Sequence, residues 1–255
     1  MKRAGYKLMI TAFLGLLLTG CNGENVPDCF QNAGDITREE VVLPSFRKIT
    51  VFEGIQLVLS SGPEQRVAIE TGEFLRKEVT ARVEGDRLIL RNENNCNLFR
   101  EYGITRVFVT TPDIDEVRSS TGWPVSSDGV LDFPNLALIS ESFNNPETET
   151  TDGSFDLELD VQQVSLVANG IAYFRLRGAA ARFNATIAAG DSRIEAEALT
   201  AQEVVLNHRG SNDILVNPQT RLSGVIRGTG DVLSYNRPDT VSVEILYKGR
   251  LIFID

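Results

Sequence analysis

Glycine recurs every 20 residues in the second half of this chain, at Gly170, Gly190, Gly210 and Gly230. Apolar pairs follow the first three glycines at offsets of four and six residues: Phe174 and Leu176, Ile194 and Ala196, Ile214 and Val216. A segment this short with strand-like alternation cannot bury a core alone, so successive segments must stack and cover one another's apolar side. The period therefore predicts an all-β chain whose second half is a parallel β-solenoid with coils of about 20 residues.

The alternation continues before each glycine, with two irregularities. The apolar set before Gly190 is displaced by one residue: Phe183, Ala185 and Ile187. Side chains alternate between the two faces of a strand, so we expect a β-bulge to absorb this slip. In the last coil, Gly228 fits the pattern better than Gly230. Fainter coils extend back toward residue 111, so we expect the solenoid, with capping strands at its C-terminal end, to occupy residues 111–255.

The first 20 residues have the pattern of a secretory signal. Three basic residues precede an apolar run over residues 8–18, which is too short to span a bilayer. The run ends in Leu17-Leu18-Thr19-Gly20-Cys21, which resembles the bacterial lipobox, where the cysteine thiol carries diacylglycerol. We therefore expect residues 1–20 to be a lipoprotein signal peptide and Cys21 to be lipidated. The alternative is an ordinary secretory signal followed by a chance cysteine.

The charge balance limits the partners of the chain. The full sequence has 25 basic and 35 acidic residues, and loss of residues 1–20 would leave 22 basic residues and a net charge of −13. An acidic surface opposes binding to nucleic acid and to anionic headgroups. We expect the membrane to be reached through the lipid on Cys21, with residues 21–45 as a polar tether. The expected location is the bacterial cell envelope, at the outer membrane, facing either the periplasm or the cell surface.

Two further cysteines remain once Cys21 is assigned to the lipid. In an oxidising compartment outside the cytoplasm, Cys29 and Cys96 are candidates for a disulfide. The bond would close a loop of about 67 residues and contribute about 2–4 kcal/mol. Two unpaired thiols remain the alternative, because a single sequence does not establish proximity.

Residues 46–110 show short strand-like segments separated by turn signals such as Ser61-Gly62-Pro63. We expect this N-terminal β-rich part to cap one end of the solenoid, because open strand edges recruit other chains. The segment from Val241 to Phe253 is expected to cover the other end.

Several of these segments resemble one known family. The opening Phe46-Arg47-Lys48-Ile49-Thr50-Val51, with the strand-like Ile55-Gln56-Leu57-Val58-Leu59, is similar to the start of the head GIN domain, described as the head of auto-transporter adhesins. The turn Gly228-Thr229-Gly230-Asp231 resembles one that recurs in this family. The resemblance covers roughly residues 46–250. It implies a right-handed parallel β-helix on a bacterial envelope lipoprotein of unassigned activity, and it supplies no catalytic residues.

The sequence offers few residues for catalysis or metal binding. Alternating acids such as Glu195 and Glu197 are expected to face solvent, and the single histidine, His208, has no partner for a metal site. No glycine-rich phosphate loop precedes a helix, so we expect no cofactor and no catalytic residues. Trp123 and Tyr173 are the candidate ligand contacts, because aromatic rings near coil turns suit sugars.

Two functions of different class follow. The first is a non-enzymatic envelope lipoprotein whose β-helical surface serves adhesion or contact with an unknown protein or glycan. The alternative is a carbohydrate-binding or polysaccharide-degrading β-helix, which predicts a groove flanked by Trp123 or Tyr173 and at least one converging pair of carboxylates. The sequence leaves the oligomeric state open.

Overall fold

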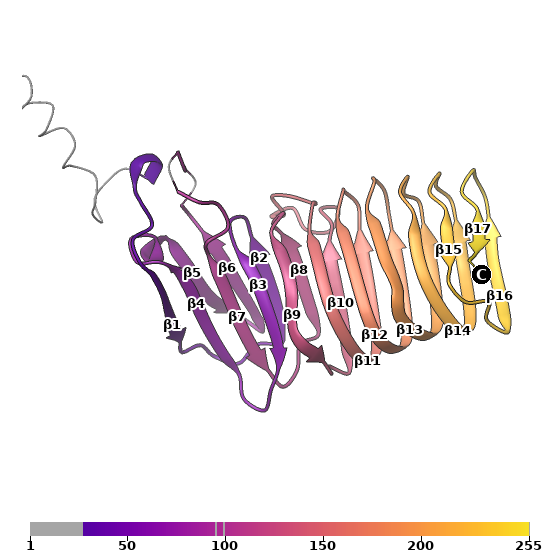
Figure 1. Cartoon of the computed structure of the whole chain (residues 1–255), viewed down its shortest axis with the longest axis horizontal. Helices are drawn as coiled ribbons and strands as arrows, with labels where there is room; N and C mark the ends of the chain where they lie inside the picture. Colours follow the sequence, from indigo (N-terminus) through magenta and orange to yellow (C-terminus); the bar gives the residue numbers. More distant parts are fainter. Residues whose placement is uncertain (1–27, 95, 99, 255) are drawn as a thin grey trace, which may run out of the picture.

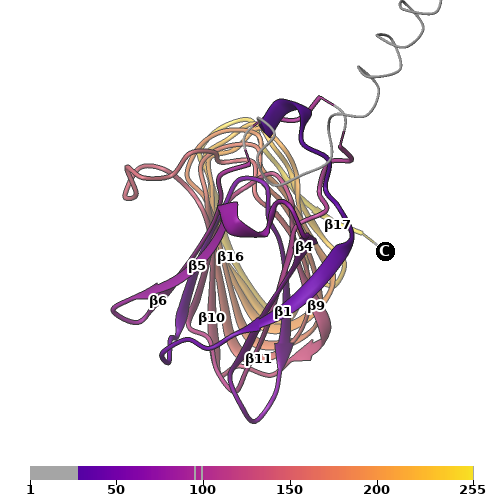
Figure 2. The same ribbon diagram turned by 90° about the vertical axis from the view of Figure 1, so that its left-hand side faces the viewer.

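The computed structural model describes residues 28–94, 96–98 and 100–254 (Figure 1). The predicted signal peptide at residues 1–20, Cys21 and the first part of the predicted tether lie outside these residues. The described chain forms one sheet of 17 strands, so the prediction of an all-β fold is confirmed. Viewed along the long axis, the sheet wraps almost completely around a common core, as in a barrel (Figure 2).

The first half of the chain contributes short strands and two short 3-10 turns. The bounds are η1 (Asp28–Phe30), β1 (Ile36–Val41), β2 (Lys48–Phe52), β3 (Gln56–Ser61), β4 (Arg66–Gly72), η2 (Arg76–Glu78), β5 (Val79–Glu84), β6 (Arg87–Asn92), β7 (Arg106–Thr111), β8 (Glu116–Ser120), β9 (Pro124–Leu131) and β10 (Asn135–Ser140).

The second half contributes four long strands and three short ones. These are β11 (Ser154–Ala168), β12 (Tyr173–Ile187), β13 (Arg193–His208), β14 (Ile214–Ile226), β15 (Val232–Ser234), β16 (Thr240–Ile245) and β17 (Leu251–Phe253). Each long strand bends from one side of the sheet to the other, so one strand forms both sides of a single coil (Figure 1).

The 20-residue period sets the pairing of these strands. Strands β11 to β15 pair in parallel, each with the next, and the pairing aligns one row of inward residues: Phe155, Phe174, Ile194, Ile214 and Val232. All five are fully buried. In this row the rings of Phe155 and Phe174 stack with centroids 4.8 Å apart. The coils therefore cover one another's apolar side, which the period predicted.

The regular spacing of the glycines has a steric cause. A Cβ atom on Gly190 would lie 2.2 Å from the carbonyl oxygen of Gly170, and one on Gly228 would lie 2.0 Å from that of Gly210. Successive turns approach each other too closely for any side chain at these positions. Gly228, rather than Gly230, is the residue that meets Gly210, as the shift of pitch in the last coil predicted.

The displaced apolar set before Gly190 points inward. Phe183, Ala185 and Ile187 are buried, and Ile187 aligns with His208 of the next coil. The pairing of β12 with β13 shifts by one residue between Arg175 and Arg177, so an irregularity within the ladder absorbs the slip.

The N-terminal strands continue the same sheet across residue 110. Strand β2 pairs in parallel with both β6 and β8, and β3 pairs with both β7 and β9. The coil formed by β2 and β3 therefore lies between a coil that follows it in the chain, β6 with β7, and the coil of β8 with β9. The predicted boundary at residue 110 is not a break in the sheet.

The outermost N-terminal strands pair antiparallel. Strand β1 pairs with β4, β4 with β7, and β5 with β6. Residues 36–41, which the sequence placed in the polar tether 21–45, thus form edge strand β1, and the tether prediction is wrong for them. An edge strand with one exposed side can be polar, so Thr37, Arg38, Glu39 and Glu40 do not prevent strand formation.

Candidate functional site

A disulfide joins Cys29 to Cys96, with their Cα atoms 4.5 Å apart. The bond fastens η1 to the loop between β6 and β7. The backbone N–H of Leu98 also donates to the carbonyl oxygen of Cys29, at 3.2 Å. The loop is therefore held covalently against the N-terminal end of the described chain.

This loop forms one wall of a small cavity of about 100 Å³. The cavity lies between the loop and the turn that carries Trp123. The lining residues are Gly54, Leu75, Asn92, Asn94, Asn97, Arg100, Glu101, Tyr102, Gly103, Ile104, Thr105 and Trp123. The ring of Trp123 lies against Gly103, where a Cβ atom would come within 2.5 Å of it. Gly103 has a φ of +72°, so glycine suits the position in conformation as well as in space.

Amide side chains organise the polar side of the cavity. Asn92 Nδ2 donates to the carbonyl oxygen of Gly54 at 3.0 Å, and Asn94 Nδ2 donates to Asn92 Oδ1 at 2.7 Å. Asn94 Oδ1 is buried and has no hydrogen-bond partner among the described residues. Buried acceptors are normally hydrogen-bonded, so Asn94 Oδ1 has capacity for one further donor. Glu101 is the single carboxylate among the described lining residues, which therefore do not supply the carboxylate pair that glycoside hydrolysis uses.

Tyr173, the second predicted contact residue, does not line this cavity. It begins β12 on the outer face of the sheet, where its hydroxyl donates to Glu195 Oε2 and accepts from Arg175 Nη2 at 2.9 Å. Partial burial and the bond to Glu195 raise the pKa of Tyr173. Hydrogen bonds from Tyr173 and Arg193 lower the pKa of Glu195. Trp123 and Tyr173 therefore belong to separate surroundings and do not flank one groove.

The turn aspartates act within the stack. Asp213 Oδ1 accepts the backbone N–H of Asp231 at 2.9 Å, and Asp231 Oδ1 accepts that of Arg250 at 2.8 Å. Each carboxylate thus connects its turn to the next coil. Among the described residues, no three His, Cys, Asp or Glu side chains converge as a metal site.

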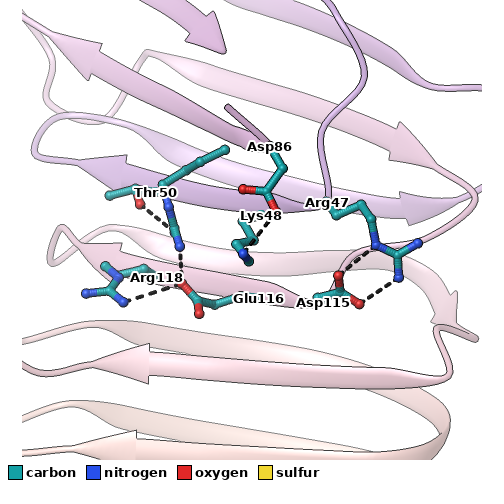
Figure 3. A network of polar contacts seen from close by, with 8 residues as sticks. Arg47, Lys48, Thr50, Asp86, Asp115, Glu116 and Arg118 are labelled. Carbon is teal, nitrogen blue, oxygen red and sulfur yellow. Dashed lines mark hydrogen bonds and ion pairs between the residues drawn. The ribbon is translucent and has the colours of Figure 1, made fainter. Parts of the chain in front are cut away.

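The sequence did not reveal an ion-pair network on the outer face of β2, β6 and β8 (Figure 3). Arg47 reaches both oxygens of Asp115 at 2.7 Å, and Lys48 lies 2.9 Å from Asp86 (Figure 3). Arg87 bonds Glu116 at 2.6 Å and Thr50 at 3.0 Å. The network joins strands 68 residues apart, and only the pairing of β2 with β8 brings them together.

Replacing Arg47 with glutamine is expected to raise the pKa of Asp115 toward its ordinary value. The hydrogen bond and charge of Arg47 hold that pKa low. The pair therefore contributes stability above about pH 4, the range of an unperturbed aspartate, and loses it as the pH falls through the depressed pKa. An NMR titration of the carboxylates measures the change. Asp86, whose pKa Lys48 lowers, is the control and should not move. An unchanged Asp115 pKa would contradict the assignment.

Taken together, the fold and these surfaces define an elongated all-β domain with ion-paired outer faces and one small aromatic and amide cavity. The family comparison agrees. Residues 45–238 match the family model described as "Putative auto-transporter adhesin, head GIN domain". The chain belongs to this family, as its sequence resemblance indicated. No curated protein sequence matches the chain significantly.

Solved structures share the fold at low sequence identity. A putative adhesin from Bacteroides fragilis superposes with a TM-score of 0.76 at 18% identity, over 88% of this chain and 99% of that chain. A putative adhesin from Parabacteroides distasonis gives 0.61 at 14% identity, over 88% and 99%. A putative lipid binding protein from the same species gives 0.59 at 15% identity, over 87% and 98%. Similarity at this level establishes the fold alone.

Proposed function

We propose that this chain is a non-enzymatic lipoprotein of the bacterial cell envelope that presents a right-handed parallel β-helix for adhesion or protein contact. The observation that carries the proposal is the adhesin-head family match over residues 45–238. The outer faces support it, because their charged side chains are engaged with one another, as in the Arg177–Asp156 and Arg182–Glu203 pairs. Charged side chains that are already paired with one another favour a stable recognition surface over a catalytic centre.

The anchor belongs to the same proposal. Cys21 carries the lipid, residues 1–20 are removed, and the outer membrane holds the protein through the acyl chains. Within the part of the chain that the structure describes, no helix has the length and hydropathy to cross a bilayer. Two or three acyl chains are sufficient for durable attachment, since each buried methylene contributes about 0.8 kcal/mol.

Metabolic labelling with a clickable fatty acid tests the anchor. We expect the chain to take up the label and to sediment with membranes, and Cys21→Ala to lose both properties. Cys29 and Cys96 remain in that variant and serve as internal controls, because they are joined in a disulfide. Label retained after Cys21→Ala, or a wild-type chain that never acquires it, would overturn the lipoprotein assignment.

The cavity beside Trp123 supports a second candidate function, the binding of a short glycan. An aromatic ring, several side-chain amides and an unpartnered buried acceptor on Asn94 are the groups that recognise sugar hydroxyls and faces. A cavity of about 100 Å³ admits part of one sugar ring rather than a long chain.

Trp123 is the only tryptophan of the chain, so its fluorescence reports on this cavity alone. If the cavity binds glycans, envelope or mucin oligosaccharides should shift or quench the emission in a saturable way. Asn94→Ala should weaken the response, and Tyr173→Phe, which lies outside the cavity, should leave it unchanged. A flat titration across a broad oligosaccharide panel would remove this candidate.

A further inference from the structure

The two ends of the stack differ in how their strand edges are protected. At the N-terminal end, the outermost strands β1 and β5 pair antiparallel with their neighbours and carry exposed charges. Arg38, Glu39 and Glu40 lie on β1, and Arg82 and Glu84 lie on β5. Charged edge strands resist pairing with another chain. This end is therefore closed to further strand addition.

Within the described residues, the strands at the C-terminal end have no such protection. Residues 241–253, which the sequence predicted to cover this end, pair over β14 and β15 as the last coil of the described chain, and no further strand of that chain covers them. Within the described chain, β16 pairs only with β14, and β17 only with β15. Val241, Val243 and Ile245 align with the inward residues Leu222, Gly224 and Ile226, so they continue the core row. Yet Val241 is 42% exposed and Ile245 is 49% exposed.

We propose that a second copy of this chain docks on the C-terminal end, with β16 pairing antiparallel to β16 of the other copy. The two copies are related by a two-fold axis that is perpendicular to the long axis of the stack and to the sheet at β16. This axis reverses the strand direction, so the contact must be antiparallel and self-complementary. Directly opposed residues in a sheet share a face. Inward residues must therefore meet inward residues, which restricts the register to pairings of odd-numbered with odd-numbered positions.

Apolar contact and charge together choose among these registers, because only with Val243 opposite itself do all three inward residues of β16 oppose one another. With Val243 opposite itself, Val241 faces Ile245, and Glu244, the one charged residue of β16, faces Ser242. A register shifted by one residue in each strand toward the C-terminus would place Glu244 opposite Glu244, which is unfavourable. Extended past the strand ends, the chosen register places Asp239 opposite Tyr247 of the other copy, one residue from Lys248. Asp239 and Lys248 are both exposed, and neither has an ion-pair partner within the described chain.

The end-to-end contact specifies the partner in adhesion, and this conclusion rests on the proposed lipid anchor at Cys21. In an end-to-end pair, the two N-terminal ends lie at opposite ends of a doubled rod. Lipids at those ends fit two opposing membranes better than one. The closed N-terminal end blocks head-to-tail addition, so the contact ends at a dimer rather than a fibre. The partner in this form of adhesion is another copy of the same chain on a neighbouring cell.

Analytical ultracentrifugation of residues 21–255 carrying Cys21→Ser tests the contact without a membrane. We expect the mass to double at high micromolar concentration. Val243→Lys should abolish the dimer, because it places two lysines opposite each other on the axis. Ser242→Lys, a matched change at the next position, should retain it, because the lysine faces Glu244 of the other copy. Thr80→Lys on β5 is the control for the opposite end and should also retain it.

Cysteine variants test the register. Opposed Cα atoms in an antiparallel pair lie about 5 Å apart, which permits a disulfide. Val243→Cys should therefore form a cross-linked dimer on oxidation, and Ser242→Cys should not, because its own copy lies on a diagonal about 7–8 Å away. A monomer at every concentration, a dimer that survives Val243→Lys, or cross-linking through Ser242→Cys would overturn the proposal.

A cell-based readout separates this proposal from the proposed function. Cells that display the wild-type chain should aggregate with one another, and cells that display Val243→Lys should not. Loss of aggregation without loss of surface display leaves the anchor intact. A chain that dimerises in solution but is never displayed would contradict the envelope function and leave the end-to-end contact standing.

Discussion

Replacing Gly228 with alanine is expected to destabilise the fold by about 3 kcal/mol, at the upper end of the usual cost of overpacking. The added Cβ would lie 2.0 Å from the carbonyl oxygen of Gly210, and a backbone atom paired within the stack cannot move aside as a flexible side chain can. Urea denaturation followed by circular dichroism measures the loss in the free energy of unfolding.

Gly129→Ala is the matched control for this prediction. Gly129 has a φ of +85°, but a Cβ there would meet nothing within 4 Å. Gly129→Ala is therefore expected to lower the free energy of unfolding only through the unfavourable backbone conformation, by about 1–2 kcal/mol. If Gly228→Ala destabilises no more than Gly129→Ala, close approach of the coils is not the reason for glycine at this position.

Truncating Phe174 to alanine is expected to cost about 3–5 kcal/mol, because it removes a buried aromatic ring and leaves a cavity between coils. Phe174 is fully buried and stacks on Phe155 of the preceding coil, so its loss weakens two coils together. Thermal and urea unfolding give the change in stability. Phe143→Ala, at a side chain that is 70% exposed, should stay within about 0.5 kcal/mol of the parent. If Phe174→Ala lowered the free energy of unfolding by less than about 0.5 kcal/mol, the placement of Phe174 in the core row would be contradicted.

The stacked coils could be predicted from the sequence because the same steric and packing requirements recur in every turn. Gly190 and Gly228 are each required by contact with the preceding turn, and rows such as Phe174 and Ile194 are required by the shared core. A constraint that recurs at a fixed interval leaves a periodic signal. The one-residue displacement of the apolar set before Gly190 could also be predicted, because inward residues remain apolar where the pairing of the strands is irregular.

The N-terminal arrangement left no comparable signal. The coil of β2 and β3 lies between strands that come later in the chain, so spatial order and sequence order differ there. Local patterns do not encode that choice. Strand β1 was missed because an edge strand has only one neighbour and tolerates the polar sequence of a tether.

The candidate site was predictable only in part. Trp123 stood out as the single tryptophan. The asparagines that line the same cavity, Asn92 at the end of β6 and Asn94 just after it, are placed by the pairing of β6 with β2. The network around Arg47 was hidden for the same reason, because Asp115 lies 68 residues further along the chain. Tyr173 resembled Trp123 in sequence, yet its hydroxyl bonds Glu195 on the outer face.

Protease accessibility on intact cells tests the central claim, that the stack is an anchored domain displayed outside the cell. A specific cleavage site inserted between Pro146 and Glu147, in an exposed loop outside the strands, should leave the coils undisturbed. We predict that the added protease cuts this variant on intact cells, and that Cys21→Ala removes the cell-bound signal. Protection from the protease until the outer membrane is permeabilised would contradict external display.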